Sequence, residues 1–373
     1  MVSKLRTVDL NITSTDQNLK TVDWNITSMG RSFSLEFDYL PRYHGTHSLE
    51  TWLLNTFLII QSIYFPILVI VGVPVNLVTI VVLSRKKCGL SKCVTQYLVA
   101  MAAADLLVII LDLMLRQIPI VFREQLLFMW NLRVCNIHAV LLYAATDCSV
   151  WFTVTFTFDR FVVICCQKLK SKYCNEKTAP VVLGTVTVLS CLKNIFWYFM
   201  FRNEYMMLIL PWFCFVTQEI AQSRMWAIIE TLHHILTPCV PFVLVLLLNA
   251  LTVKCILVTS RARWRLRSHN NGYSPRDPEM ESRRKSIILL FAISGNFILL
   301  WAMFMVYSIW IRMWSMGDQS VYIPFYVQQM GVMLQLLSCC TNTCIYVVAQ
   351  TKFREQLKNV VKYAFAVIVR FMK

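Results

Sequence analysis

Seven apolar stretches dominate the pattern of hydrophobic and polar positions along the chain. They lie at residues 52–83, 93–122, 136–166, 178–201, 225–258, 286–311 and 321–349. Each exceeds the roughly 20 residues that a helix needs to cross the hydrocarbon core of a bilayer. Prolines inside or at the ends of several stretches predict kinks, which the neighbouring helices of a membrane bundle tolerate. The pattern therefore predicts an all-α membrane protein, a bundle of seven transmembrane helices.

The composition argues against a soluble protein. Hydrophobic residues make up 57% of the chain and charged residues only 15%, whereas roughly a quarter of the residues of a soluble domain are charged. A large soluble all-helical core would also need polar helix faces, which these stretches lack. The sequence contains no Gly-rich phosphate loop, no zinc-protease motif and no pairing of Ser or Cys with His at a membrane surface. We therefore expect no enzyme.

The net charge of +16 is distributed unequally between the two predicted sides of the membrane. Basic residues crowd the segments that follow the first, third, fifth and seventh apolar stretches, whereas residues 1–55 hold five basic and six acidic residues. This positive-inside pattern predicts an extracellular N-terminus and a cytosolic C-terminus. Topology and contact with anionic membrane lipids explain the excess charge, so nucleic acid is not needed as a partner.

The spans divide the chain into three predicted parts. Residues 1–51 form an extracellular segment, in which the triplets starting at Asn11 and Asn25 are N-glycosylation acceptors. This segment begins without an apolar signal region, so the first span is expected to direct insertion. Residues 52–350 form the seven-transmembrane domain. Residues 351–373 form a short amphipathic eighth helix and tail in the cytosol.

The third apolar stretch carries two adjacent charges, Asp159 and Arg160. Cys135 precedes Arg160 by 25 residues, which is about 37 Å along a helix and slightly more than a hydrocarbon core. Cys135 is therefore expected at the outer rim and the charge pair at the solvated cytosolic edge, where arginine reaches the headgroups. Simple termination of the span by charges is the alternative explanation.

Further motifs occur in a characteristic order. They are Asn76 after Gly72 and Pro74, Asp105, the pair Asp159–Arg160, Pro241 with Asn249, Phe297 with Trp301, Asn342-Thr-Cys-Ile-Tyr346, and Lys352-Phe353-Arg354. With these motifs, residues 50–366 resemble the rhodopsin-like family of G-protein-coupled receptors. The stretches FTFDRF, PWFC and CCTNTCIY look closest to an orphan branch associated with aromatic amino acids and short peptides.

The sequence also departs from the family pattern. Asn249 stands where the family usually has tyrosine, Thr343 replaces the proline of the NPxxY motif, and Met303 replaces the proline that follows Trp301. The fourth span lacks its usual tryptophan. These departures concern the fifth to seventh spans most.

The resemblance implies a plasma-membrane receptor that converts binding of an extracellular zwitterionic or peptide ligand into activation of a heterotrimeric G protein. It implies that Arg160 is held by Asp159 at rest and is freed to contact the G protein, with Asn342 and Tyr346 in the same coupling machinery. It also implies a disulfide between Cys135 and Cys214. A membrane transporter or channel is the alternative function, although the repeated halves and broken spans typical of transporters are not visible. A non-signalling decoy is a third interpretation.

The buried carboxylate of the second span, Asp105, implies by resemblance an allosteric sodium ion, the one cofactor expected. An ionised carboxylate in the middle of a span is unfavourable unless it is paired or hydrated. The residues that would surround the ion are Ser149, Trp301, Ser338 and Asn342. A protonated or water-bridged Asp105 without an ion is the alternative.

The outer half of the bundle is expected to hold the ligand. By resemblance, Leu142 stands where amine receptors carry an aspartate, and the absence of lysine from the seventh span excludes a retinal Schiff base. The candidate ligand-binding residues are Asp112, Arg116, Tyr143, Thr146, Glu230, His233, His234, Trp301, Phe304 and Met305. An aromatic wall with opposite charges at its mouth suits a zwitterionic aromatic amino acid or short peptide.

Four polar residues of the bundle have a structural alternative. Asp112 and Arg116 can satisfy each other one helical turn apart. Asp147 is expected to pair with His233 or His234 rather than with a ligand. Lys193 in the fourth span is expected to extend outward to the headgroups.

The cytosolic segments predict how signalling is switched off. One face of the predicted eighth helix carries Phe353, Leu357, Val361, Phe365 and Ile368, which suits a helix lying in the inner leaflet. No Ser, Thr or Cys follows Thr351, so arrestin recruitment is expected to be weak or to depend on the serines of loop three, the linker at 268–282 and its flanks. These serines are Ser260, Ser268, Ser274 and Ser282. In the same loop Arg283 stands where many relatives carry an acid, which predicts high basal activity.

Overall fold

The computed structural model describes a chain of helices. The described residues are 47–85, 88–122, 131–166, 168–169, 176–205, 213–221, 223–267, 278–315 and 325–371. The chain separates into two compact units, Met1–Thr56 and Phe57–Lys373. The glycosylation acceptors Asn11 and Asn25 lie outside the described residues, and the fold below is that of the second unit.

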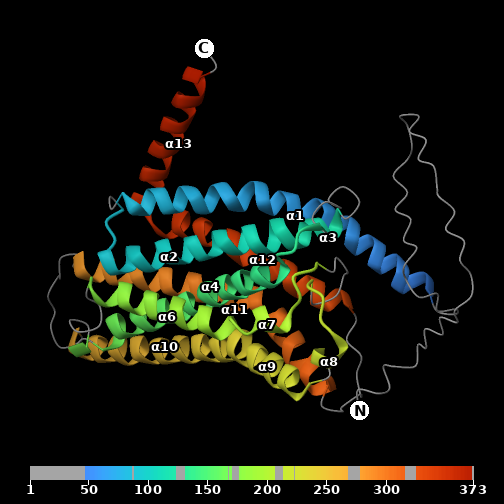
Figure 1. The fold of residues 1–373 in the computed structure, drawn as a ribbon. Helices are drawn as coiled ribbons and strands as arrows, with labels where there is room; N and C mark the ends of the chain where they lie inside the picture. The colour runs from blue at the N-terminus through green and yellow to red at the C-terminus, as the bar shows by residue number, and fades with distance from the viewer. Residues whose placement is uncertain are drawn as a thin grey trace, which may run out of the picture. The chain divides into compact units, whose positions relative to one another are not determined.

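The elements follow one another along the chain as helices (Figure 1). They are α1 (His47–Ser84), α2 (Lys92–Val108), η2 (Ile109–Gln117), α3 (Ile118–Val121), α4 (Cys135–Cys165), α6 (Thr178–Asn194), α7 (Trp197–Met200), α8 (Gln218–Ala221), α9 (Arg224–His234), η4 (Ile235–Cys239), α10 (Val240–Arg267), α11 (Pro278–Ser315), α12 (Phe325–Ala349) and α13 (Thr351–Phe371). Among the described residues, seven helical segments are long and apolar enough to cross a membrane. The predicted all-α bundle with seven transmembrane helices is confirmed.

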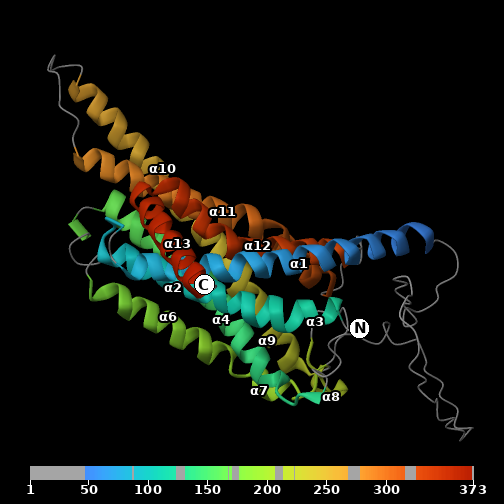
Figure 2. The ribbon, with the colours of Figure 1, turned by 90° about the horizontal axis from the view of Figure 1, so that it is seen from above.

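Helix α4 lies at the centre of the bundle. It packs against α2, α6, α10 and α11, and the two views in Figures 1 and 2 both place it among these helices. In its most apolar window 61% of the residues are buried, against 17% in the fourth span. Because α4 is enclosed on most sides, its polar side chains must find partners inside the protein. The functional residues therefore concentrate along this helix.

Two π-helical segments interrupt the spans at prolines. Element η2 ends directly before α3, in which Pro119 follows Ile118, and η4 contains Pro238. Proline lacks a backbone N–H and crowds the preceding turn, so the hydrogen-bond ladder widens there. The prolines predict kinks, but the π-turns themselves are a finding of the structure. Each π-turn changes the direction in which the side chains on either side of it point from the helix axis.

Helices α11 and α12 approach closely. A Cβ atom added at Gly331 of α12 would lie 3.1 Å from the Cα of Phe304 on α11. Helix α11 runs without interruption from Pro278 to Ser315, in keeping with Met303 in place of proline. It also begins inside the predicted linker, because residues 278–282 are helical and only 268–277 of that linker lie outside the described residues.

Helix α13 is the predicted eighth helix. It runs across the direction of the spans after leaving α12 (Figure 1). Phe353 is fully buried and packs edge-on against Tyr346 at 5.9 Å, whereas Tyr363 is 68% exposed. Phe353 thus fixes the start of the helix to the bundle, Leu357 and Val360 are partly buried against the same cluster, and the described residues 361–363 are exposed.

Candidate functional site

The charge pair near the C-terminal end of α4 is buried. Asp159 and Arg160 are 5% and 6% exposed. The Nε atom of Arg160 donates to the Asp159 carboxylate at 3.0 Å, and a second guanidinium nitrogen donates to the same oxygen. A third nitrogen donates to the hydroxyl of Ser286 on α11 at 3.4 Å. The thiol of Cys93 on α2 donates to Asp159 at 3.5 Å. The pair therefore ties α4 to both neighbouring helices.

This geometry corrects the expected solvated position of Arg160. The guanidinium lies beneath the surface and over the ring of Phe156, 5.9 Å from its centroid. Arg283 belongs to α11, but its side chain is outside the described residues. Ser286, three residues further along, is the described contact of Arg160 on α11. No pattern in the sequence points to this serine.

Asp105 sits between α4 and α12. Its carboxylate accepts from the hydroxyl of Ser149 at 2.6 Å and from the amide of Asn342 at 2.7 Å. Ser338 instead accepts from the indole N–H of Trp301 at 3.1 Å. A carboxylate, two hydroxyls and an amide oxygen are ligands of the hard type that a sodium ion takes. The residues present therefore fit the ion that the sequence implies, with Asp105 as its charged ligand.

Thr343, which replaces the proline of the family motif, has a hydrogen-bond partner on α1. Its hydroxyl lies 2.7 Å from the hydroxyl of Thr79 and donates at 3.4 Å to the carbonyl of Val75. The polar side chain thus joins α12 to α1 where the family has proline. Tyr346, one turn later, is 1% exposed and its hydroxyl has no hydrogen-bond partner among the described residues.

The outer end of the second span holds a compact charged group. Arg116 and Asp112 form an ion pair at 3.4 Å, and Gln117 donates to the same carboxylate at 3.0 Å. The guanidinium of Arg116 also lies over the ring of Phe213, 5.1 Å from its centroid. Asp112 and Arg116 therefore satisfy each other, and Phe213 covers the arginine.

Aromatic rings from three spans meet beside this group. The ring of Tyr143 lies 5.4 Å from that of Trp197 and 5.1 Å from that of His233, and His234 is 5.9 Å from His233. Glu230, one turn before His234 on α9, is within electrostatic reach of the Tyr143 hydroxyl. Three other ligand candidates, Glu230, His233 and His234, thus lie near Tyr143, and His234 reaches it through the ring of His233.

The remaining ligand candidates lie deeper. The ring of Phe304 stands edge-on to Trp301 at 6.0 Å, and both pack with Met305 in one apolar cluster. The hydroxyl of Thr146 donates to the carbonyl of Leu142 on its own helix at 3.0 Å.

Asp147 and Lys193 form a buried polar network in the middle of the bundle. Lys193 on α6 donates to the two oxygens of Asp147 at 2.9 and 2.7 Å and to the hydroxyl of Thr237 at 2.8 Å. Thr237, in the π-turn η4, donates to Asp147 at 2.7 Å, and the amide of Asn194 donates at 2.5 Å. One carboxylate, 1% exposed, thereby holds α4, α6 and η4 together.

Two expectations are wrong at this network. Lys193 points into the bundle and does not extend to the headgroups. The carboxylate of Asp147 takes Lys193 as its charged partner, whereas His233 packs against the ring of Tyr143. The physical reason is that a buried carboxylate gains most from a full positive charge with hydrogen-bonding geometry.

The segment after the fourth span covers the outer end of α4. Cys135 and Cys214 form the predicted disulfide, with Cα atoms 5.6 Å apart, and a single β-bridge pairs Tyr205 with Cys214. The Nε2 atom of His138 lies 2.7 Å from the carbonyl of Leu111 and Nδ1 lies 3.2 Å from the Tyr205 hydroxyl. Because the Leu111 carbonyl can only accept, Nε2 of a neutral His138 donates to it and Nδ1 accepts from the Tyr205 hydroxyl.

Sequence reasoning missed several residues of the outer half. They are His138, Asn194, Trp197, Phe213 and Thr237. Phe213 precedes Cys214 in the sequence, so the expected disulfide could have pointed to it. Thr237 precedes Pro238, but the π-turn that turns it inward leaves no pattern in the residues themselves.

Comparison with curated proteins finds three relatives that carry the same name. "G-protein coupled receptor 39" of Mus musculus is 24% identical over 179 residues, which are 48% of this chain and 37% of the relative. The proteins of the same name from Bos taurus and Homo sapiens are each 25% identical over 182 residues, which are 48% of this chain and 37% and 38% of the relatives. The aligned part thus spans less than two fifths of the relatives' length.

A family model covers most of the chain. The model of the 7 transmembrane receptor (rhodopsin family) matches residues 75–346, which include the second to seventh spans and the end of the first. This family consists of receptors, as the prediction of a non-enzyme requires. The match begins at Val75, beside Asn76, and ends at Tyr346, the last residue of the seventh-span motif. The chain belongs to the rhodopsin family of seven-transmembrane receptors.

Proposed function

We propose that the chain is a plasma-membrane receptor that converts binding of an extracellular ligand into activation of a heterotrimeric G protein. The observation that carries this proposal is the buried pair Asp159–Arg160 with its contact to Ser286 on α11. An arginine held this way is unavailable to a partner. Movement of α11 away from α4 breaks the contact with Ser286 and opens the cytosolic end around Arg160.

A chain of polar contacts supports transmission through the bundle. Trp301 on α11 bonds Ser338 on α12, and Asn342, one turn further, bonds Asp105 on α2. Ligand contact with the Trp301 cluster would shift α11 relative to α12, and the change would reach Tyr346 one turn beyond Asn342. Asp105, Ser149, Ser338 and Asn342 would hold the allosteric sodium ion, which stabilises the closed arrangement by neutralising the buried carboxylate.

The ligand is a small zwitterion with an aromatic group, or a short peptide. Its carboxylate would replace Asp112 at Arg116, and its ammonium would take Asp112 or Glu230. The rings of Tyr143 and His233 would bind its aromatic part. Thr146, His234, Phe304 and Met305 complete the candidate set. Because Phe213 covers Arg116 at 5.1 Å, binding requires that this ring move aside.

The orientation follows from the charge distribution. The N-terminal segment, with Asn11 and Asn25 as glycosylation sites, lies outside the cell, and the basic segments lie against the inner leaflet. Cys135 and Cys214 then face the oxidising side, where disulfides persist. The partners are the ligand, the G protein, membrane lipids and, through loop three, arrestin.

The experiment is ligand-dependent nucleotide exchange. Membranes that contain the chain and a G protein are exposed to a panel of amino acids and short peptides, and GTP-analogue binding is measured alongside ion and substrate flux. We expect exchange without flux. Arg160→Ala should abolish exchange when it is compared with the wild type at equal surface level, measured by antibody. Flux without exchange would instead identify a transporter or channel, and full exchange by Arg160→Ala would refute the mechanism.

A further inference from the structure

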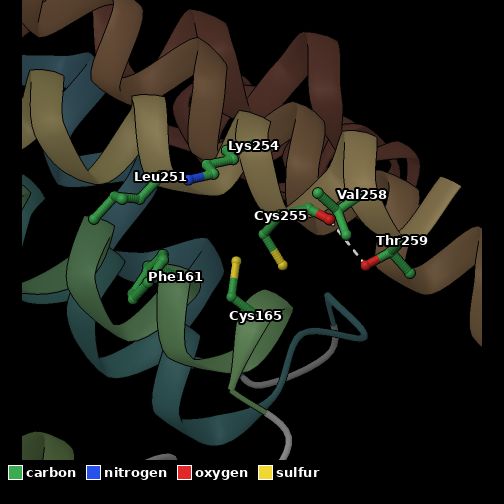
Figure 3. A pocket seen from close by; sticks show the side chains of 7 residues that line it. All are labelled: Phe161, Cys165, Leu251, Lys254, Cys255, Val258 and Thr259. Carbon is green, nitrogen blue, oxygen red and sulfur yellow. Dashed lines mark hydrogen bonds between the residues drawn. The ribbon is translucent and has the colours of Figure 1, made fainter. Parts of the chain in front are cut away.

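A groove opens between the cytosolic halves of α4 and α10, away from the sites described above (Figure 3). It encloses about 290 Å³ and is lined by seven side chains, two from α4 and five from α10. Figure 3 shows Phe161 and Leu251 at one end and Val258 and Thr259 at the other. The groove is therefore a slot that runs along the two helices.

The groove lies on the part of the bundle that a bilayer surrounds. Both walls belong to spans, Cys135–Cys165 and Arg224–Arg261. Lys254 precedes Arg261 by seven residues, so it lies about 10 Å along the helix from the cytosolic end of its span. At this depth the surface meets the boundary between acyl chains and headgroups. The molecules available to fill the groove are thus lipids of the inner leaflet, given the orientation proposed above.

The chemistry of the lining selects among these lipids. Lys254 is the one charged residue of the seven, and none of them is acidic. The hydroxyl of Thr259 donates to the carbonyl of Cys255 on its own helix at 2.9 Å, so it does not offer a competing polar group. Leu251 and Val258 are 40% and 59% exposed. The slot therefore combines apolar walls with a single positive charge.

We infer that this groove binds one anionic phospholipid of the inner leaflet. An acyl chain lies in the slot along Phe161 and Leu251, and the phosphate lies against the ammonium group of Lys254. Lysine is suited to this role, because its stem lies along apolar surface while its charge reaches the headgroup. Phe161 directly follows Arg160, so the lipid lies next to the helix turn that carries the charge pair. The inference uses the orientation proposed above and neither the ligand nor the G protein.

A lipid-retention experiment tests the contribution of the Lys254 charge. The full chain is reconstituted in nanodiscs of phosphatidylcholine with phosphatidylserine, and the lipids that remain bound are counted by native mass spectrometry. We expect phosphatidylserine to be retained in preference to phosphatidylcholine. Lys254→Gln should reduce this preference roughly five-fold, the factor that one basic residue near an anionic surface contributes. Lys254→Arg should keep it, as should the control Lys285→Gln at the cytosolic end of α11.

Two cysteines in the groove test whether the lipid lies there. The thiols of Cys165 and Cys255 line the groove and point toward each other in Figure 3, so an acyl chain there should slow their alkylation by N-ethylmaleimide. Peptide mapping should show slower alkylation in nanodiscs with phosphatidylserine than in phosphatidylcholine alone. Cys88 is an internal control, because it is buried and burial raises the pKa of its thiol.

Four outcomes would overturn the inference. The first is an unchanged phosphatidylserine preference in Lys254→Gln, and the second is an equal loss in Lys285→Gln, which would indicate diffuse attraction by the basic surface. The third is equal protection of the two thiols by soluble glycerophosphoserine, which would indicate a site for a free anion. The fourth is a cross-link between two copies of the chain through Cys255, which would show that a second copy covers the groove.

Discussion

Four carboxylates of the described spans are buried, and they are stabilised in two ways. Asp112, Asp147 and Asp159 each meet a cation, which is Arg116, Lys193 and Arg160 respectively. Asp105 instead accepts from a hydroxyl and an amide and meets no cation among the described residues. Since an uncompensated charge inside a membrane is unfavourable, the first three carboxylates belong to closed ion pairs. Asp105 is the one suited to an exchangeable ion.

The Asp147–Lys193 pair should be strongly coupled. Lys193→Met leaves a carboxylate that is 1% exposed without its cation, and loss of one partner of a buried pair costs about 3–5 kcal/mol. We expect a large fall in the melting temperature of the purified receptor. The double variant Asp147→Leu with Lys193→Met should recover most of it, because apolar replacement of both partners is often neutral.

A matched control for that prediction is the pair Lys92–Glu176, whose side chains are 59% and 56% exposed. Lys92→Met should change stability by less than about 1 kcal/mol. Equal melting temperatures for Lys193→Met and Lys92→Met would contradict the network described here.

Arg283 should raise ligand-independent signalling. With Arg284 and Lys285 it forms a run of three positive charges near the start of α11, and like charges disfavour the approach of this end to Arg160. Arg283→Glu should lower basal second-messenger production at equal surface level. Arg283→Gln, which removes the charge without reversing it, should have an intermediate effect. An unchanged baseline in both variants counts against this account.

Among the elements, α11 and α12 form the closest pair. A Cβ atom at Gly331 would lie 3.1 Å from the backbone of Phe304, and at Gly72 of α1 it would lie 2.6 Å from the sulphur of Cys340. Glycine at these positions permits backbones to approach, as in other membrane helix pairs. Gly184 and Gly295, in contrast, have open space where a Cβ would lie. Only the first two glycines are needed for packing.

Alanine substitutions should separate these two kinds of glycine. Gly295→Ala should stabilise the receptor by up to about 1 kcal/mol, the difference in helix propensity. Gly331→Ala should lose that gain and destabilise, because the backbone of α11 has to shift. Thermal unfolding of both variants in the same detergent measures the difference. Equal stabilisation by the two substitutions would show that α11 and α12 are less close than described.

The sequence was sufficient to predict the spans, but not the inward face of α6. Span length and side-specific charge define where each helix crosses, and motif spacing located Asp105, Asp159 and Asn342. Helix α6 is apolar on all sides, so hydropathy does not show which face points inward, and Lys193 was expected outside. The π-turn η4 adds a further shift that a 3.6-residue period cannot follow. Thr237 therefore could not be placed.

For the whole molecule, the positive charges divide the surface into two unlike ends. The segments that follow the first, third, fifth and seventh spans carry the excess of basic residues. Helix α13 follows the seventh span, is anchored by Phe353 and continues across the direction of the spans.

Arrestin recruitment should depend on loop three. Phosphate on its serines would lie among arginines and form charge-assisted pairs that order the loop. Replacing these serines by alanine should remove ligand-driven recruitment, whereas truncation after Val367 should leave it. The four serines are Ser260, Ser268, Ser274 and Ser282, of which Ser268 and Ser274 lie outside the described residues. Loss of recruitment in the truncation alone would reverse the assignment.

The pair between α4 and α6 also bears on biosynthesis. Lys193 lies inside the fourth span, where it pairs with Asp147, and a lysine charge within the bilayer is unfavourable for an isolated helix. Asp147 is 46 residues earlier in the chain, so the third span is synthesised first. We expect the third span to supply the partner of Lys193 when the fourth span inserts. We expect Asp147→Ala to increase the fraction of nascent chains whose fourth span fails to cross, measured with a glycosylation tag placed after Met200.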